Sequence, residues 1–245
     1  MLSFGVTTVE GKSGYGLDAA TELKQLTVMA ELERQHPVEV VRTFMGAHAI
    51  PAEYKGRTDD FVDYLLLEVL PLVAERQLAE FCDVFCEKGV FSVEQSRRLL
   101  TAAQAMGIKA KVHADEIVTL GGAELAAEIS ALSAEHLLHA SDAGIRRMAE
   151  TGVISVLLPA TAFCLREPYA RARFMIDSGV PVALATDFNP GSCFSESIPL
   201  VIALAALYMQ MTPAEIVTAL TINAAAAVGR ADRIGSLEAG KQGDF

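Results

Sequence analysis

Strand-like runs alternate with helix-like runs along almost the whole chain, and this alternation constrains the fold more than any other feature. Seven apolar runs have the length of strands: 5–11, 38–48, 79–87, 108–115, 134–141, 152–160 and 180–188. The intervening segments have helical spacing: 18–36, 59–78, 92–107, 121–132, 141–152 and 167–179. Such alternation predicts a parallel sheet covered by crossover helices.

Residues at the helix ends support this division of the chain. Ser92 precedes a helical run and Gln95 follows three residues later, which is the pattern of a capping box. Gly107, Gly152 and Gly179 each stand between a helical run and a strand, where a left-handed cap favours glycine. The first predicted strand is not followed by a GxGxxG or GxxxxGKS turn, so the pattern does not indicate a nucleotide-binding fold.

The number of units points to a barrel. A length of 245 residues is usual for a single (β/α)8 barrel, which needs eight strands. About seven β/α units are visible. Either one strand lacks a recognisable strand pattern, or the chain starts one unit late. We predict an α/β barrel of the TIM type over 1–233. A helix is expected to start at Thr212 or Pro213, and 234–245, with an incipient strand at 243–245, is expected to leave the barrel.

Charge and hydropathy weigh against two classes of partner. The formal net charge is −11, and no local cluster of Lys and Arg offsets it, which disfavours nucleic acid. The most apolar stretch, 198–211, is shorter than the ~20 residues that span a bilayer, so we predict a buried helix there.

No signal-peptide pattern opens the sequence. Four cysteines without a CxxC pair favour a reduced, cytoplasmic protein.

Polar residues gather where the predicted strands end, which is where a parallel barrel holds its ligand site. Four of the five histidines fall there, and only His36 stands at a helix end. Chance placement would rarely produce this pattern, so we expect a site at one rim of the barrel. The candidates are Glu10, Lys12, His48, Glu87, His113, Asp115, Glu116, His136, His139, Thr161, Asp187 and Asn189.

His113 and Asp187 form the strongest pair in this set. Alternation places Ala183, Ala185 and Asp187 on one face of a strand, so small side chains leave room beside a carboxylate. A buried carboxylate needs a cation or several donors, and an imidazole with a carboxylate is half of a Zn²⁺ or Fe²⁺ site. A single strand-end histidine is more often structural, however, and Glu116 suits a helix N-terminus as well as a site.

His136 and His139 lie three residues apart in one predicted strand, so they are expected to face opposite sides of the sheet. Only one of them can then point into the barrel. We expect the other to pack against a helix.

Eight short motifs occur in the order found in a known superfamily: VEGKSGYGL, FMGAHAIP, DVFCEKGVFS, KVHADE, SAEHLLH, LLPATAF, ATDFNPGS and GSLEAGK. Over essentially its whole length the chain resembles the amidohydrolase superfamily and, within it, the imidazolonepropionase family of histidine degradation. The resemblance implies a metal-dependent hydrolase barrel of the (β/α)8 type with a small β-sandwich. In that family the first barrel strand carries a His-x-His metal pair. This sequence has no HxH, so we expect a chain that starts at the second barrel unit and lacks most of the sandwich.

The resemblance also implies a role for each matching residue. His113 and Asp187 match metal ligands, Glu116 matches the acid beside the metal-bound water, and His136 matches the histidine near the reacting carbonyl. His139 has no such role. The residues that match substrate-binding positions are Tyr15, His48, Asn189, Gly191 and Ser192, with Glu116 beside them. The implied cofactor is one divalent metal ion, Zn or Fe.

The implied reaction is the hydrolytic opening of 4-imidazolone-5-propanoate to N-formimidoyl-L-glutamate by a cytoplasmic homodimer. Either Asp187 or Glu116 would serve as the base. Two alternatives stay open at this point. One is another cyclic amidine hydrolase or deaminase of the same superfamily. The other is a catalytically incomplete barrel fragment that only packs against a partner.

Overall fold

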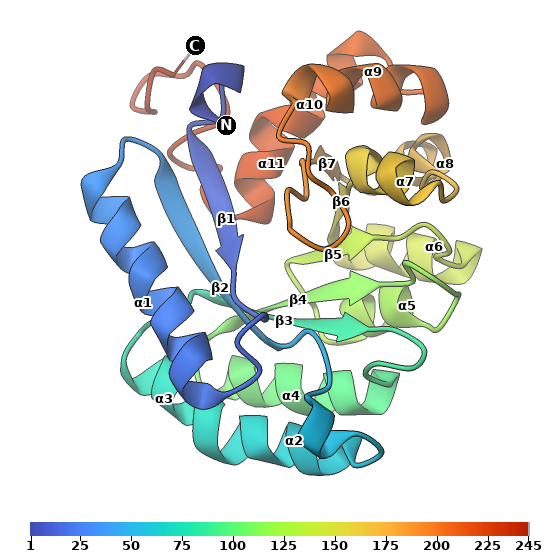
Figure 1. Ribbon diagram of the computed structural model, residues 1–245. Helices are drawn as coiled ribbons and strands as arrows, with labels where there is room; N and C mark the ends of the chain where they lie inside the picture. Colours follow the sequence, from blue (N-terminus) through green and yellow to red (C-terminus); the bar gives the residue numbers. More distant parts are fainter. Residues whose placement is uncertain (245) are drawn as a thin grey trace.

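The computed structural model describes residues 1–244, and its framework is one curled sheet of seven parallel strands (Figure 1). They are β1 (Thr8–Lys12), β2 (Glu39–Ala47), β3 (Phe81–Cys86), β4 (Lys109–Ala114), β5 (Ser133–His136), β6 (Ile154–Leu157) and β7 (Val182–Leu184). They lie in chain order, with β1 and β7 at the two edges. All seven predicted strands are present, each shorter than expected, and the predicted α/β barrel architecture is confirmed.

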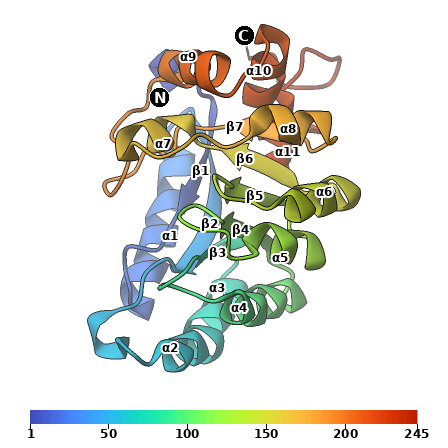
Figure 2. The same cartoon turned by 90° about the vertical axis from the view of Figure 1, so that its right-hand side faces the viewer.

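Helices cover the outer face of this sheet. The longer ones are α1 (Ala19–Gln35), α4 (Val93–Ala105), α5 (Gly122–Glu128), α6 (Asp142–Thr151), α9 (Ile198–Tyr208) and α10 (Pro213–Leu220). The shorter ones are α2 (Thr58–Tyr64), α3 (Leu70–Glu75), α7 (Pro159–Leu165), α8 (Ala172–Asp177) and α11 (Ile222–Ala227), with single turns η1 (Leu2–Phe4) and η2 (Ala52–Tyr54). Figure 2 shows α4, α5 and α6 following one another along β3, β4 and β5.

Local signals at the helix ends act as the sequence predicts. Ser92 and Gln95 form a capping box at α4, and Thr212 forms another with Glu215 at α10. Gly107 and Gly152 have φ of 83° and 74°, left-handed values that glycine adopts without a steric penalty. These caps satisfy backbone groups that a helix end otherwise leaves unpaired.

Several predicted elements break or end where the sequence did not indicate it. The run expected as one helix over 59–78 is interrupted between α2 and α3 by a π-helical turn, η3 (Leu65–Val69). The helix expected over 167–179 is reduced to α8. The strand expected over 152–160 stops at Leu157, because Pro159 starts α7. The strand expected over 134–141 stops at His136, where φ is 68° and the extended backbone ends.

This early end of β5 corrects the argument about His136 and His139. The two residues do not share a strand, because Leu137 also has a positive φ and the chain turns away before His139. Strand alternation therefore does not apply between them. The expectation that only His136 faces the barrel holds for a different reason, namely this turn.

Helix α9 also differs from the prediction. The segment 198–211 was expected to be a buried helix, but only one face of it, with Val201, Leu204 and Ala205, is buried. Leu207 and Tyr208 are 75% and 59% exposed. Among the described residues, no helix is both long enough and apolar enough to cross a membrane.

Apolar residues pack on both sides of the sheet. A large core lies between the outer face and the helices and includes Val182 and Leu184 of β7. A smaller cluster fills part of the interior, where Ala183 meets Val156 and Leu158. The predicted alternation is therefore confirmed for 182–184, with the small residue Ala183 facing inward. β7 ends at Leu184, and Thr186, which was expected on the helix side, lines the same cavity as Asp187.

Charged residues occupy another part of the barrel interior. Lys12 of β1 lies 2.7 Å from Asp83 of β3 and 2.9 Å from Glu10. Lys111 of β4 lies 2.8 Å from the second oxygen of Glu10, and its side chain is fully buried. Glu135 of β5 lies 3.8 Å from Lys111 and 3.9 Å from Lys12. These ion pairs connect β1, β3, β4 and β5 through the interior.

The last part of the chain runs through turns after α11. Residues 231–244 contain no strand, and Lys241 holds them together by donating to the carbonyl of Ala231 and the hydroxyl of Ser236. The predicted incipient strand at 243–245 includes Phe245, which lies outside the described residues. The boundary at 233/234 stays a prediction.

We predict that the interior ion pairs make the fold acid-sensitive. Burial raises the pKa of Glu10, but Lys111 and Lys12 outweigh it and lower this pKa from 4.5 to about 2. A lowered folded-state pKa stabilises the fold above pH 4.5, and this stabilisation is lost as the pH falls toward 2. Urea unfolding at pH 7, 5, 4 and 3 should show a steeper loss for the wild type than for Glu10→Gln, by about 2 kcal/mol in total. Parallel curves for the two proteins would contradict this.

Candidate active site

A cavity of about 1400 Å³ opens at the carboxyl ends of the strands. Its polar wall is formed by residues that follow β1, β2, β4, β5 and β7. All nine predicted site residues line it: Tyr15, His48, His113, Glu116, His136, Asp187, Asn189, Gly191 and Ser192. The cavity continues between the two edge strands, where apolar residues such as Val9, Ala183 and Ala224 form its wall.

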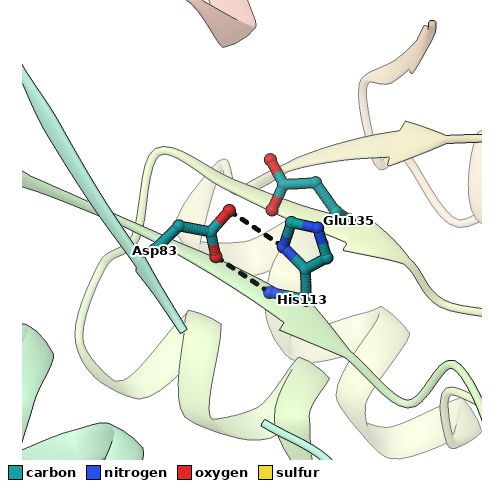
Figure 3. A group of neighbouring side chains, drawn as sticks. All are labelled: Asp83, His113 and Glu135. Atoms are coloured by element: carbon teal, nitrogen blue, oxygen red, sulfur yellow. Dashed lines mark hydrogen bonds and ion pairs between the residues drawn. The ribbon is translucent and has the colours of Figure 1, made fainter. Parts of the chain in front are cut away.

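His113 lies on β4 and points into the barrel beside two carboxylates (Figure 3). Its Nδ1 atom is 2.8 Å from Oδ2 of Asp83, and its backbone amide donates to Oδ1 of the same residue at 3.1 Å. The side-chain contact lies off the axis of the ring N–H, so it is an electrostatic contact rather than an aligned hydrogen bond. Burial lowers the pKa of His113, but the carboxylate of Asp83 outweighs it and raises this pKa.

Asp83, His113 and Glu135 offer ligand atoms within 4.8 Å of one another, which is a spacing that a metal ion could use. The ammonium group of Lys12, however, already lies 2.7 Å from Asp83 and 3.9 Å from Glu135. A lysine therefore supplies the positive charge at this position. This group does not fit a metal ion while Lys12 stays there, since the two cations would repel each other.

Asp83 is not among the residues predicted from the sequence. It stands in the middle of β3, whereas the predicted site residues were expected at strand ends. The signal was present, because an acid within the apolar run FCDVFC must be buried and must find a partner.

His136 stands between the other polar groups of the cavity. Its ring centroid is 5.1 Å from that of His113, its Nδ1 is 3.6 Å from Oε1 of Glu116, and its Nε2 is 4.0 Å from Oδ2 of Asp187. Burial lowers the pKa of His136, and the nearby His113 lowers it further. The imidazole of His136 is therefore neutral at neutral pH and has a single N–H to donate.

Glu116 has a pKa that suits it to proton transfer near neutral pH. Burial raises its pKa to about 7, against the opposing effect of His113 and with support from the carboxylates of Asp187 and Glu87. A carboxyl group with this pKa can both accept and release a proton near neutral pH. Asp187 is held by Thr161, whose hydroxyl donates to Oδ2 at 2.7 Å.

Three residues at the rim have left-handed backbones. Asp115, His136 and Asp187 have φ of 50°, 68° and 50°, values that are uncommon for residues other than glycine. Asp115 and His136 stand at or directly after the end of a strand, and Asp187 follows the end of β7 by three residues. Strained backbone of this kind concentrates at functional sites, where it aims a side chain that a regular strand would direct elsewhere.

The turn after Asp187 is built around Asn189. Its Oδ1 accepts from the amides of Gly191 and Ser192 at 2.8 and 2.7 Å, and its Nδ2 donates to the carbonyl of Asp187. The side chain of Asn189 is therefore engaged within the turn. Across the cavity, the rings of Tyr15 and His48 lie 4.7 Å apart, and burial lowers the pKa of His48.

Several other strand-end candidates are engaged in contacts of their own. Glu87 and Asp115 accept from backbone amides of the loop after β4. His139 is half-buried outside the cavity, and its carbonyl accepts from Thr119. Glu10 and Lys12 reach the cavity wall but belong to the interior ion pairs.

The donor set of the cavity fits a divalent zinc or iron ion. It combines the imidazoles of His113 and His136 with the carboxylates of Glu116 and Asp187, which are ligand types that both metals accept.

Comparison with known proteins agrees with this picture. Residues 87–245 match the model of the amidohydrolase family. The whole chain is 65% identical to the imidazolonepropionase of Phocaeicola vulgatus over 247 residues and 64% identical to that of Clostridium tetani over 245 residues. It covers 60% and 58% of those two proteins, so it spans about three fifths of the length of these relatives.

Two solved structures that contain zinc have a similar fold at low sequence identity. An atrazine chlorohydrolase from Arthrobacter aurescens, complexed with zinc, aligns with a TM-score of 0.74 at 18% identity over 98% of this chain and 59% of its own. An adenosine deaminase from Xanthomonas campestris with bound zinc aligns with a TM-score of 0.68 at 19% identity over 99% of this chain and 57% of its own. These likenesses support the fold alone.

We predict that Glu116 titrates near pH 7 in the metal-free chain. The carboxyl signal of Glu116 in ¹³C NMR should have its midpoint there, and Asp187→Asn should lower this midpoint because one nearby negative charge is removed. Asn also tolerates the left-handed backbone at position 187, so the fold is retained. A midpoint near the ordinary value of 4.5 in the wild type would show that the carboxyl group is hydrated.

Proposed function

Because the chain belongs to the amidohydrolase family, we propose that the protein hydrolyses the ring amide of 4-imidazolone-5-propanoate and forms N-formimidoyl-L-glutamate. The observation that carries this proposal is the row of Glu116, His136 and Asp187 along one cavity. Relatives named imidazolonepropionase, which align with the whole chain at 61 to 66% identity, support the choice of substrate.

In this proposal His113 and Asp187 hold one divalent ion, zinc or iron. When bound, such an ion lowers the pKa of water and polarises a carbonyl group. The two residues supply an imidazole nitrogen and a carboxylate oxygen, and each of them lies near His136. Metal analysis of the purified protein distinguishes zinc from iron.

Glu116 is the proton carrier in this mechanism. The oxygen of water bonds to the ring carbonyl carbon, the carbon–nitrogen bond breaks, and a proton must pass from the water to the leaving nitrogen. Glu116, with a pKa of about 7, accepts this proton in one step and releases it in the next. Its raised pKa favours Glu116 over Asp187 as the base.

His136 is placed to stabilise the negative charge that develops on the carbonyl oxygen. It lies within the cavity at 3.6 Å from Glu116 and is neutral, so it can donate its N–H to that oxygen. A fixed donor of this kind is typically worth about 3 kcal/mol in the transition state.

The remaining predicted residues would orient the substrate. Tyr15 and His48 provide flat surfaces against which the imidazolone ring can pack. On the opposite side of the cavity, the turn that Asn189 braces presents Gly191 and Ser192 to the propionate group. A Cβ atom at Gly191 would lie 3.7 Å from the hydroxyl of Tyr15, so the two sides approach each other closely.

We also propose a cytoplasmic homodimer that binds neither nucleic acid nor membranes. The net charge of −11 supports the exclusion of nucleic acid, and the exposed apolar residues Leu207 and Tyr208 on α9 offer surface for a second copy. Sedimentation velocity would separate a dimer from a monomer.

We predict that Asp187→Asn abolishes turnover and weakens metal binding while the protein stays folded. The expected loss in kcat is about 10³-fold or more, since the carboxylate is removed from the reacting centre. His139→Ala is the control, with kcat within about threefold of the wild type and a loss of about 1 kcal/mol in stability, because this side chain is half-buried outside the cavity. Formation of N-formimidoyl-L-glutamate and the melting temperature are measured for both variants. Normal turnover by Asp187→Asn would refute the assignment.

A further inference from the structure

The loop that carries Glu116 is held by two buried carboxylates that do not line the cavity. This loop connects β4 to α5 and spans 115–121. Glu87 and Asp115 are 1% and 0% exposed, and both direct their carboxylate oxygens at backbone amides of the loop or of the first residues of α5. The mechanism proposed above assigns no role to either residue.

Asp115 holds the far end of the loop. Its Oδ1 accepts from the amides of Leu120 and Gly121 at 2.7 and 2.9 Å, and its Oδ2 accepts from the amide of Ala123 at 2.9 Å. These are amides at and before the first turn of α5, which lack helical partners. Asp115 therefore caps α5 and fixes where the loop ends.

Glu87 holds the near end of the loop, directly beside Glu116. Its Oε2 accepts from the amide of Ile117 at 2.8 Å, and its Oε1 accepts from the amide of Lys88 at 2.7 Å. The side chain of Ile117 is 58% exposed, so packing contributes little to holding this residue. The bond to Glu87 is the contact that fixes the peptide following Glu116.

Glu87 itself is rigidly placed. It directly follows β3, its own amide donates to the carbonyl of Phe91, and its carbonyl accepts from Val90, both at 3.0 Å. The bridge between Cys86 and Phe91 closes the same turn. A fixed carboxylate on a fixed turn is a suitable anchor for a loop on the neighbouring strand.

We propose that Glu87 is a positioning residue for Glu116: by binding the amide of Ile117 it fixes the peptide after Glu116 and keeps the Glu116 carboxylate beside His136. This inference rests on the proposed function, in which Glu116 carries the proton. Displacement of a reacting group by about 1 Å can cost about 100-fold in rate.

The charge of Glu87 has no salt-bridge partner within residues 1–244, although a buried carboxylate without one is costly. Two backbone amides compensate part of that cost, and one of them belongs to the loop of Glu116. The carboxylate of Glu87 also contributes to the raised pKa of Glu116. Glu87 thus acts on Glu116 through both its hydrogen bond and its charge.

The test compares Glu87→Met with Glu87→Gln in the intact protein that carries this chain. Met has a similar volume and only a weak thioether acceptor. Gln keeps one oxygen for Ile117 and gives up the bond to the amide of Lys88, which is an exposed residue. Hydrogen exchange of the Ile117 amide, kcat, KM and the melting temperature are measured for each protein.

We expect that a variant which loses the protection of the Ile117 amide from hydrogen exchange also loses kcat. Glu87→Met should lose this protection and about 10- to 100-fold in kcat, with KM changed less than about threefold. Glu87→Gln should keep most of the protection of the Ile117 amide and most of the kcat. Lost protection with an unchanged kcat, lost kcat with intact protection, or no change in either for Glu87→Met would each overturn the proposal.

Glu116→Gln separates this inference from the proposed function. If that variant turns over normally, Glu116 is not the proton carrier and the proposed mechanism fails. The exchange of the Ile117 amide in the Glu87 variants would still show whether Glu87 holds the loop, because that measurement does not depend on turnover.

Discussion

The ion pair between Lys12 and Asp83 is the interaction on which the rest of the barrel depends. It joins β1, at one edge of the sheet, to β3 across the interior, and the same carboxylate contacts both the ring and the backbone of His113. Removal of one partner from a buried pair leaves an unpaired charge and typically costs about 3 to 5 kcal/mol. This one contact therefore helps to hold both the edge strand β1 and the ring of a cavity residue.

The barrel contains two kinds of buried carboxylate, and their partners decide what each kind does. Glu10 and Asp83 lie deep in the interior and are paired with lysines, so they stay ionised and contribute to the architecture. Glu116 lies at the rim, where burial and neighbouring carboxylates raise its pKa to about 7. The carboxyl group thus stays ionised when lysines pair with it in the interior, and it can exchange protons at the rim, where no lysine within residues 1–244 does.

Much of this organisation could be predicted from the sequence because it is set by local patterns. The alternation of Val182 with Ala183 and the capping box at Ser92 are short-range signals. Signals of this kind also indicate where each strand ends, and the cavity lies at the carboxyl ends of the strands. The partner of Asp83 could not be predicted, because Lys12 is 71 positions away in the chain and only the curled sheet brings them together. The end of β5 was missed because a left-handed residue such as His136 has no compositional signal.

The left-handed backbones of Asp115, His136 and Asp187 also restrict which substitutions the rim can tolerate. Branched side chains such as Val or Ile are poorly compatible with this conformation, whereas Gly and Asn adopt it readily. A mutational scan of these positions therefore reports on two properties at once, the chemistry of the side chain and the permitted backbone. At Asp187, Asn is the replacement that separates them, since it removes the charge and leaves the chain direction unchanged.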